Sequence, residues 1–323
     1  MANIEYRTLG DSGLIVSTIG LGCNNFGRAG TATETQEGTD AVIGAAIDAG
    51  VTFFDTADIY GKERGLSETL MGASLQGKRD RIVLATKFGM DMAGVNGPDW
   101  GVRGSRRYIR LAVESSLRRL RTDWIDLYQL HRPDPVTPIE ETLATLDDLI
   151  AEGKIRYIGH SNLAGWQIAE AEFTARLAGH PKFVSAQNEY SLLVREAERE
   201  VLPAVNAYGL GFLPFFPLYN GLFTGKFSRQ GGPADSRIMT ARKHLLDDAP
   251  WDAIERYQAF CDERGVTMLQ ATFAWLLAQP GLTSVIAGAT RPEQIVANAE
   301  AATALTPSRE DIATISGFFP LDR

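Results

Sequence analysis

The chain has 323 residues, of which 44% are hydrophobic and 22% are charged, and its formal net charge is −8. This composition is typical of a globular protein with a large core, and the net negative charge without basic runs argues against a nucleic-acid-binding protein. The two cysteines, Cys23 and Cys261, are too few for a disulfide framework or a zinc cluster, so no metal site is expected.

Two long stretches, 201–225 and 265–290, contain no charged residue and are candidates for membrane spans. Prolines at 203, 214 and 217 interrupt the first stretch, and polar residues with Pro280 divide the second. Neither forms a continuous apolar span of about 20 residues, so we expect no membrane partner. The first residues contain no apolar signal region, and a cytoplasmic location is therefore expected.

Strand and helix patterns alternate along the chain. The segment from Tyr6 to Val16 holds Gly10 and Gly13 between two extended runs, which predicts a hairpin closing one end of the fold. Strands are expected at 19–22, around 51–54 and at 82–87, 125–130, 155–159, 183–187, 211–214 and 284–287. Helices are expected at 39–49, 67–75, 105–120, 138–152, 164–177, 196–208, 251–264, 267–279, 292–301 and from 308, with a long loop from 217 to about 248.

Eight successive strands with helices between them favour a parallel sheet closed into a barrel. The predicted fold is an α/β protein, a (β/α)8 TIM barrel in a single domain spanning 1–323, with an N-terminal hairpin, a long loop after strand 7 and extra C-terminal helices. No Gly-x-Gly-x-x-Gly motif follows the first strand, which counts against a Rossmann domain. The active site of a TIM barrel lies at the carboxyl ends of its strands.

Four ionisable side chains lie at or just past such strand ends: Asp55, Tyr60, Lys87 and His131. A carboxylate at the end of an apolar strand needs a cationic partner, which Lys87 can provide. A tyrosine beside an ammonium can donate a proton to a developing alkoxide, and a histidine can polarise a carbonyl. A general acid without a nucleophile fits carbonyl reduction with hydride from a cofactor.

Each of these residues also has a structural interpretation. Asp55 and Lys87 alone suggest a buried ion pair, Tyr60 a packed aromatic residue, and His131 a hydrogen-bonded core residue. Four such residue types at three successive strand ends favour the catalytic interpretation.

Seven ordered motifs resemble those of the aldo-keto reductase superfamily over nearly the whole chain. They are GVTFFDTADIYG (50–61), TK (86–87), SLRRLRTDWIDLYQLHRPD (116–134), GHSN (159–162), QNEY (187–190), PLYNGLFTGK (217–226) and GATR (288–291). The resemblance implies a barrel that binds NADP(H) across its carboxyl-terminal face, with Asp55, Tyr60, Lys87 and His131 as catalytic tetrad and Tyr60 as proton donor.

The resemblance also implies which residues bind the cofactor. Ser161, Asn162 and Gln187 match positions that hold the nicotinamide carboxamide, and Phe215 matches the ring that stacks on it, with Phe216 as a rival. The pyrophosphate loop and the adenosine end are matched by Leu218, Gly221, Leu222, Thr224, Gly225, Lys226, Gly288, Thr290, Arg291, Gln294 and Asn298. Arg291 offers a guanidinium for a 2′-phosphate, which favours NADP over NAD.

Three further residues have open roles. His160 stands where the family more often has an aliphatic residue, and a hydrogen-bonded buried histidine is expected there. Cys23 is either a wall of the substrate cavity or a plain buried thiol. Trp100 either walls the substrate or only shields the site.

The sequence therefore predicts an NADPH-dependent reductase of small aldehydes or ketones. One alternative is a nicotinamide-binding regulatory subunit, because potassium-channel β subunits share the barrel and the tetrad. A second is an isomerase or aldolase in which Lys87 forms a Schiff base, although Asp55 favours the ammonium form of that lysine.

Overall fold

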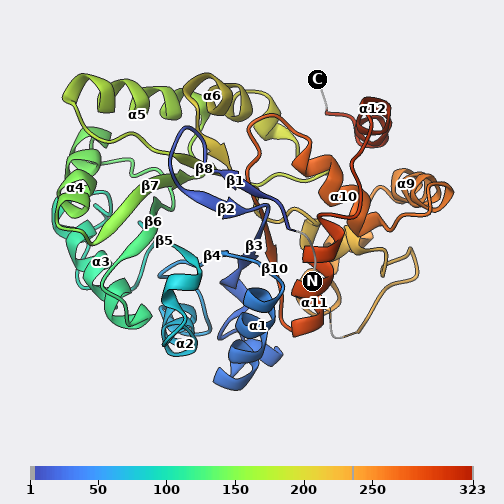
Figure 1. Ribbon diagram of the computed structural model, residues 1–323, viewed down its shortest axis with the longest axis horizontal. Helices are drawn as coiled ribbons and strands as arrows, with labels where there is room; N and C mark the ends of the chain where they lie inside the picture. The colour runs from blue at the N-terminus through green and yellow to red at the C-terminus, as the bar shows by residue number, and fades with distance from the viewer. Residues whose placement is uncertain (1–3, 235, 322–323) are drawn as a thin grey trace.

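The computed structural model describes residues 4–234 and 236–321. In this part of the chain, eight parallel strands form one sheet in the order β10-β3-β4-β5-β6-β7-β8-β9, and the helices lie outside it (Figure 1). The strands are β3 (Ile19–Gly22), β4 (Phe53–Asp55), β5 (Val83–Phe88), β6 (Ile125–Leu130), β7 (Ile155–Ser161), β8 (Ser185–Gln187), β9 (Gly211–Phe212) and β10 (Val285–Gly288). The fold is the predicted (β/α)8 barrel.

The barrel closes where β9 meets β10, the two strands at the ends of the sheet order, through a few backbone hydrogen bonds. The amide of Thr283 donates to the carbonyl oxygen of Phe212 at 3.0 Å, and the amide of Ile286 donates to that of Pro214 at 3.1 Å. β9 and β10 are therefore joined at bridge positions, whereas β5, β6 and β7 pair over longer registers.

The helices follow the strands in the predicted alternation. They are α1 (Gln36–Asp48), α2 (Leu66–Ser74), α3 (Arg106–Leu120), α4 (Ile139–Ala151), α5 (Gly165–Ala178), α6 (Val201–Tyr208), α7 (Arg237–Ala241), α8 (His244–Asp247), α9 (Trp251–Glu263), α10 (Met268–Leu277), α11 (Pro292–Ala301) and α12 (Arg309–Phe318). Hydroxyl caps begin several of them, such as Ser105, whose oxygen accepts from the Tyr108 amide at the start of α3. Within the described residues, no helix is long and apolar enough to span a membrane.

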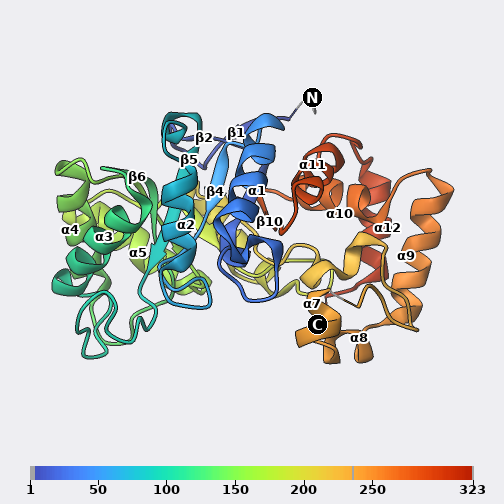
Figure 2. The same cartoon turned by 90° about the horizontal axis from the view of Figure 1, so that it is seen from below.

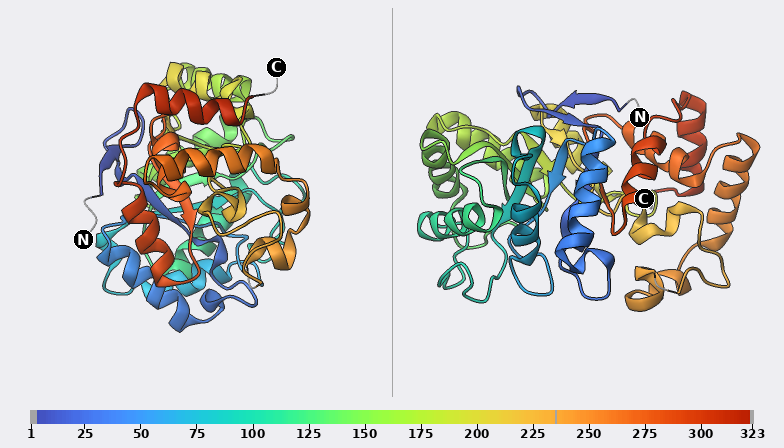
Figure 3. Two further views of the ribbon diagram at one scale, coloured as in Figure 1. Left: turned by 90° about the vertical axis from the view of Figure 1, so that its right-hand side faces the viewer. Right: turned by 60° about the horizontal axis from the view of Figure 1, so that its bottom comes forward.

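The predicted hairpin covers one end of the barrel. Strands β1 (Tyr6–Thr8) and β2 (Ile15–Ser17) pair antiparallel. Leu9 and Leu14, in the segment that connects them, and Val16 of β2 pack into the barrel interior. Figure 2 shows the hairpin at the upper side of the molecule and α7 and α8 at the lower side, and the right view of Figure 3 shows the same division. The opposite end, where the strands finish, is left for the site.

Most elements differ from the expected boundaries by a few residues, and two segments contain short helices that were not expected. The helix expected at 196–208 is a short 3₁₀ turn, η4 (Glu196–Glu198), followed by α6 from Val201. The long loop after the seventh barrel strand, which is β9, lies where expected, but it contains the 3₁₀ helix η5 (Tyr219–Thr224) as well as α7 and α8.

A glycine sets the distance between α2 and α3. A Cβ at Gly72 would lie 2.2 Å from the carbonyl oxygen of Arg119, whereas a Cβ at Gly44 in α1 would meet nothing within 4 Å. We expect Gly72→Ala to destabilise the protein by about 1–3 kcal/mol through overpacking, and Gly44→Ala to stabilise it by about 0.5–1 kcal/mol through helix propensity. Urea unfolding of both variants measures the difference, and equal effects would contradict this account of Gly72.

Candidate active site

Three polar residues of the site point into the barrel at the carboxyl ends of their strands. On each strand, the previous side chain that points into the barrel is apolar. Side chains two residues apart on a strand face the same side of a sheet. Moving two residues toward the carboxyl end of each strand therefore changes the side chain that faces the barrel interior from apolar to polar. This holds on three neighbouring strands, where Phe53 is followed by Asp55, Ala85 by Lys87, and Leu127 by Gln129. This step separates the core of the barrel from its reactive end.

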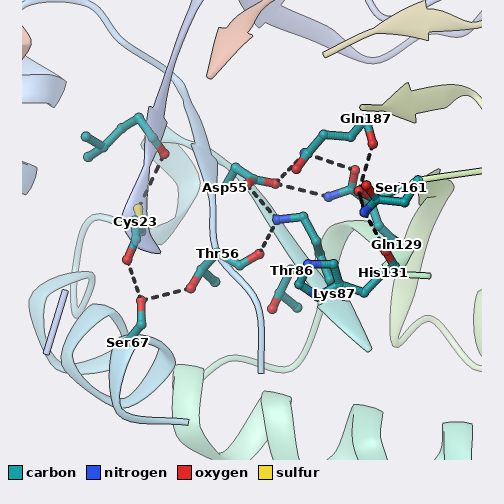
Figure 4. Close-up of polar contacts among 12 residues, drawn as sticks. Cys23, Asp55, Thr56, Ser67, Thr86, Lys87, Gln129, His131, Ser161 and Gln187 are labelled. Carbon is teal, nitrogen blue, oxygen red and sulfur yellow. Dashed lines mark hydrogen bonds and ion pairs between the residues drawn. The ribbon is translucent and has the colours of Figure 1, made fainter. Parts of the chain in front are cut away.

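Asp55 and Lys87 form a buried ion pair at this level. The Lys87 Nζ donates to Asp55 Oδ2 at 2.6 Å and to the Thr56 carbonyl oxygen at 2.8 Å (Figure 4). The other carboxylate oxygen, Oδ1, accepts from the amide groups of Gln129 at 3.1 Å and Gln187 at 2.9 Å. Both oxygens of Asp55 therefore have donors, which fix the orientation of the carboxylate beside Lys87.

The charge of Lys87 is maintained by its neighbours. Burial alone would lower the pKa of this amine, but the Asp55 carboxylate and the Tyr60 oxygen together raise the pKa of Lys87 above its usual value. Lys87 is 0% exposed, so its ammonium acts on Tyr60 with little screening by water.

Tyr60 lies in the loop that follows β4. The loop is held by backbone bonds, from the Tyr60 amide to the Ala57 oxygen and from the Ser67 amide to the Tyr60 oxygen, both at 3.1 Å. The Lys87 Nζ lies 5.2 Å from the centre of the Tyr60 ring. Burial raises the pKa of the Tyr60 phenol, and the Lys87 charge opposes that rise only in part. The phenol is therefore protonated at neutral pH.

His131 follows β6 and meets Tyr60 edge-on. Its backbone amide donates to the Phe88 oxygen at 2.8 Å, and its ring lies 5.8 Å from the Tyr60 ring at an interplanar angle of 88°. Burial and the Lys87 charge hold the pKa of His131 well below its usual value, so the imidazole is neutral. Its Nδ1 has no hydrogen-bond partner among the described residues. The structure thus brings all four predicted catalytic side chains together.

A second buried network, which the sequence analysis did not identify, lies behind the Tyr60 loop. Asn96 donates to Asp58 at 2.9 Å, and Arg119 donates to Asn96 at 3.0 Å and to Glu68 at 2.7 Å. Thr86, next to Lys87, donates to the other oxygen of Glu68 at 2.6 Å. Burial and the nearby Glu68 charge raise the pKa of Asp58 well above its usual value. This network connects the loop that carries Tyr60 to β5. The sequence signal for it was Asp58, an acidic residue in an otherwise apolar segment.

The residues expected near a nicotinamide carboxamide lie at the ends of β7 and β8. The Ser161 hydroxyl donates to the Gln187 carbonyl oxygen at 2.7 Å, and the Asn162 amide group donates to the His131 carbonyl oxygen at 3.0 Å. Asn162 has a left-handed backbone, with φ of 61°. These bonds place Asn162 beside the tetrad, whereas Gln187 uses its amide group to hold Asp55.

Phe215 and Phe216 take different positions after β9. Their rings are in edge contact, with centroids 5.3 Å apart. Phe215 forms a bridge with Glu189, whereas Phe216 lies beneath two guanidinium groups, those of Arg237 and Arg242, at 5.4 and 5.5 Å from its ring centre.

The predicted pyrophosphate loop forms a series of tight turns. Tyr219, Asn220, Gly221 and Gly225 have left-handed backbones, and the Thr224 hydroxyl donates to the Gly221 oxygen at 2.6 Å. The side chain of Leu222 is buried in the core, so Leu222 can contact a cofactor only through its backbone. Gly221 and Gly225 have no side chain and can likewise offer only their backbone. Lys226 and Gly225 are exposed. Turned backbone next to an exposed lysine fits an extended anionic cofactor.

The predicted adenosine end lies where β10 leads into α11. Gln294 accepts from the amide of Thr290 at 2.7 Å and from its hydroxyl at 3.2 Å, and Arg291 is the N-cap residue of α11. Asn298 is buried on the same helix. A Cβ at Gly288 would lie 2.8 Å from Asn25 Nδ2, so this strand end approaches the loop after β3 closely. The predicted cofactor residues thus lie along the carboxyl-terminal face of the barrel.

Three half-buried arginines, Arg28, Arg237 and Arg242, lie next to this face and were also missed. We call them the arginine cluster. Burial and the charges of Arg28 and Arg242 lower the pKa of Arg237 to about 10, and burial and Arg242 lower the pKa of Arg28. Arg28 is more than 200 positions from the other two, so no local pattern indicates the cluster.

The structure shows the surroundings of the three residues with open roles. Cys23 is fully buried, with its thiol 3.4 Å from the Leu21 oxygen, so it is no exposed wall of a cavity. Trp100 is 72% exposed and stacks with Arg107. The hydrogen bonds expected for His160 are absent within the described residues: neither ring nitrogen has a partner, the ring meets Phe183 edge-on, and burial lowers its pKa to about 3.

Comparison with known proteins adds to this geometry. The model of the family described as "Aldo/keto reductase family" matches residues 18–318. The chain is 39% identical to "Uncharacterized oxidoreductase YrpG" of Bacillus subtilis (strain 168), over 90% of this chain and 89% of that protein. It is 35% identical to "Probable voltage-gated potassium channel subunit beta" of Oryza sativa subsp. japonica, over 92% and 91% of the two chains. It is 33% identical to "L-glyceraldehyde 3-phosphate reductase" of Escherichia coli (strain K12), over 97% and 91%.

Proposed function

The chain belongs to the aldo/keto reductase family and is similar to proteins named as an oxidoreductase and a reductase, and we propose that it reduces small aldehydes or ketones with NADPH and that Tyr60 donates the proton. The observation that carries the proposal is the buried ion pair of Lys87 and Asp55, which lies beside a protonated phenol at the open end of the barrel. Bound NADPH would supply the hydride.

The proton step follows from the surroundings of Tyr60. As the carbonyl oxygen gains negative charge, the phenol transfers its proton to that oxygen and becomes a phenolate. The Lys87 ammonium stabilises the phenolate, and Asp55 holds that ammonium in place through its 2.6 Å bond. Neutral His131 cannot act as a strong acid, so its role is to orient the carbonyl oxygen by a hydrogen bond.

The cofactor site is proposed along the rim described above. Asn162 and Ser161 would hold the carboxamide, and Phe215 would stack on the nicotinamide, since guanidinium groups already cover the ring of Phe216. Lys226 would bind the pyrophosphate, and Arg291, at the start of α11, would bind the 2′-phosphate that distinguishes NADP from NAD.

The proposal predicts a specific pH dependence. Because burial keeps the pKa of Tyr60 above its usual value of about 10, reduction should be constant through neutral pH and fall only in strongly alkaline buffer. Oxidation of the alcohol needs the phenolate and should rise over the same alkaline range. Profiles of kcat/KM in both directions test this, and an inflection near pH 6.5 in reduction would show that His131 titrates, contrary to its lowered pKa.

An assay of NADPH oxidation across a panel of aldehydes, ketones and sugars tests the function as a whole. Turnover of at least one carbonyl class is expected, and binding of NADPH without turnover of any would contradict the proposal. That outcome would favour the alternative of a nicotinamide-binding regulatory subunit, which the 35% identity to a potassium-channel β subunit of rice supports. Borohydride trapping of a carbonyl on Lys87 would instead favour a Schiff-base enzyme.

A further inference from the structure

Five largely buried side chains from five segments form one hydrogen-bonded group behind the Tyr60 loop. They are Asp58 in that loop, Glu68 on α2, Thr86 on β5, Asn96 in the loop after β5 and Arg119 on α3, and we call them the Arg119 network. Arg119 is its centre, because its Nε donates to Glu68 at 2.7 Å and its Nη1 donates to Asn96 at 3.0 Å.

The bonds of the Arg119 network leave β5 at one residue and return to it at the next. From Thr86 they pass through the rest of the network to Asp58, whose carboxylate accepts from Asn96 at 2.9 Å. The backbone amide of Asp58 then donates to the Lys87 carbonyl oxygen at 3.1 Å. Because neighbouring residues of a strand face opposite sides of the sheet, Lys87 points into the barrel while Thr86 points toward the helices outside it. Bonds on the outer side of the barrel therefore act on the strand residue that carries the ammonium.

Arg119 also lies directly against the end of the Tyr60 loop. A Cβ at Gly65, the N-cap residue of α2, would lie 2.6 Å from the Cδ of Arg119 and 2.8 Å from its Nε. Tyr60 stands between Asp58, which the network bonds, and Gly65, on which the guanidinium packs. The loop is thus fixed on both sides of the phenol by contacts that depend on Arg119.

The distance between Tyr60 and Lys87 determines how well the ammonium stabilises a phenolate. The Lys87 Nζ lies 5.2 Å from the centre of the Tyr60 ring, and its charge acts to lower the pKa of the phenol. A displacement of about 1 Å at a reacting group can cost about 100-fold in rate. The other charged or titratable groups that face the phenol are Asp55, Asp58, His131 and Arg28.

We propose that Arg119 is a positioning residue for the reaction: it holds Tyr60 against the Lys87 ammonium and so sets the rate of the proton step, without contact with substrate or cofactor. The inference rests on the proposed reductase function and adds to it a residue on the outer side of the barrel. Asn96 and Asp58 transmit the effect by hydrogen bonds, so Asp58 acts as an acceptor and its charge is dispensable.

The first experiment compares Arg119→Met with Arg79→Met. Arg79 is similarly buried and pairs with the buried Asp126 at 2.7 Å, near the amino ends of β5 and β6 and away from the tetrad. Each substitution leaves a buried carboxylate without its cation, so both should lower the urea midpoint. Arg119→Met alone should lower kcat, by about 10- to 100-fold per NADPH-binding molecule, with little change in the KM for the aldehyde or in NADPH affinity.

A second pair of variants disturbs Arg119 without removing a charge. Gly65 and Gly77 both have left-handed backbones, with φ of 86° and 73°, so alanine strains the chain at either position. The new Cβ would displace Arg119 at position 65 and would meet nothing within 4 Å at position 77. Gly65→Ala should therefore lower kcat, and Gly77→Ala should keep it. This pair decides the question if Arg119→Met fails to fold.

A conservative variant tests how the effect is transmitted. Asp58→Asn keeps an oxygen that can accept from Asn96 and should retain native kcat, because burial already favours the uncharged form of Asp58 by raising its pKa. Asp58→Leu has no acceptor and should lose turnover as Arg119→Met does. Equal losses in the two Asp58 variants would overturn the proposed transmission by hydrogen bonds.

The pKa of Tyr60 provides a readout that a purely structural role would not move. Moving the phenol away from the ammonium weakens the charge that lowers its pKa, so the alkaline rise of alcohol oxidation should shift to higher pH in Arg119→Met and stay in place in Arg79→Met. A folded Arg119→Met with native kcat and an unshifted profile would overturn the proposal. An equal loss of kcat in Arg79→Met would do so as well.

Failure of the proposed function would look different. If the native protein reduced no carbonyl, the Tyr60 phenol could still be titrated by its absorbance, as the difference between the native protein and Tyr60→Phe. A higher pKa of Tyr60 in Arg119→Met would then support the positioning role although the reductase assignment was wrong. An unchanged pKa would overturn the positioning role itself.

Discussion

Replacing Tyr60 with phenylalanine is expected to reduce carbonyl turnover by about 100- to 10,000-fold, the usual contribution of a general acid. The variant keeps the ring that meets His131 at 5.8 Å and loses only the hydroxyl that gives the proton. NADPH affinity, measured by quenching of protein fluorescence, should be nearly unchanged because the predicted cofactor contacts lie on other residues.

The control for this variant is Tyr208→Phe, which removes a hydroxyl from α6 on the outside of the barrel. It should retain native turnover and native NADPH affinity. Undiminished turnover in Tyr60→Phe would refute the proton-donor role, and a loss of NADPH affinity in that variant would show that the hydroxyl serves binding.

Replacing Lys87 with methionine is expected to destabilise the protein by about 3–5 kcal/mol and to abolish turnover, because the substitution leaves a buried carboxylate without its cation. Asp55 is 3% exposed, and the amides of Gln129 and Gln187 would be its remaining side-chain donors. Urea unfolding measures the stability, and NADPH oxidation measures the turnover.

The double variant Asp55→Leu with Lys87→Met separates stability from catalysis. Removing both charges should restore much of the lost stability, since an apolar pair can replace a buried ion pair at little cost. Turnover should stay lost, because no ammonium remains beside Tyr60. Recovery of turnover would contradict the role of Lys87. If the double variant were no more stable than Lys87→Met, the ion pair would stabilise the fold by more than the neutralisation of two buried charges.

The strands that form the barrel were predictable because they are buried on both faces. β3 and β6 begin and end at the expected residues, Ile19–Gly22 and Ile125–Leu130. The candidate site was predictable for a related reason. Asp55 and Lys87 interrupt apolar runs at strand ends, and parallel strands bring those ends to one side of the sheet.

The start of α6 was not predictable because a distant contact decides it. Arg195 bonds Glu198 at 2.7 Å and also donates to the carbonyl oxygens of Ser316 and Phe319, near the end of the chain. These bonds hold the turn before Glu200, whose φ of −141° is outside the helical range. The charged segment alone has a helical pattern and carries no sign of this partner.

The arginine cluster and the surroundings of His160 could not be predicted either, because they also depend on contacts between distant parts of the chain. The charges of Arg28 and Arg242 meet only because the loop after β3 and the loop after β9 reach the same rim. His160 was expected to be hydrogen-bonded because buried polar groups usually are, but its strand turns the ring toward Phe183. Neither outcome can be read from the neighbouring residues.

The bonds of Asp55 also fix the order in which a nascent chain can complete its site. Lys87 follows 32 positions later, Gln129 follows 74 positions later, and Gln187 follows 132 positions later. During synthesis from the N-terminus, the cation that pairs with the carboxylate is therefore made well before the last amide donor. A chain truncated before β8 can therefore contain the whole tetrad and still leave one carboxylate oxygen short of its final donor.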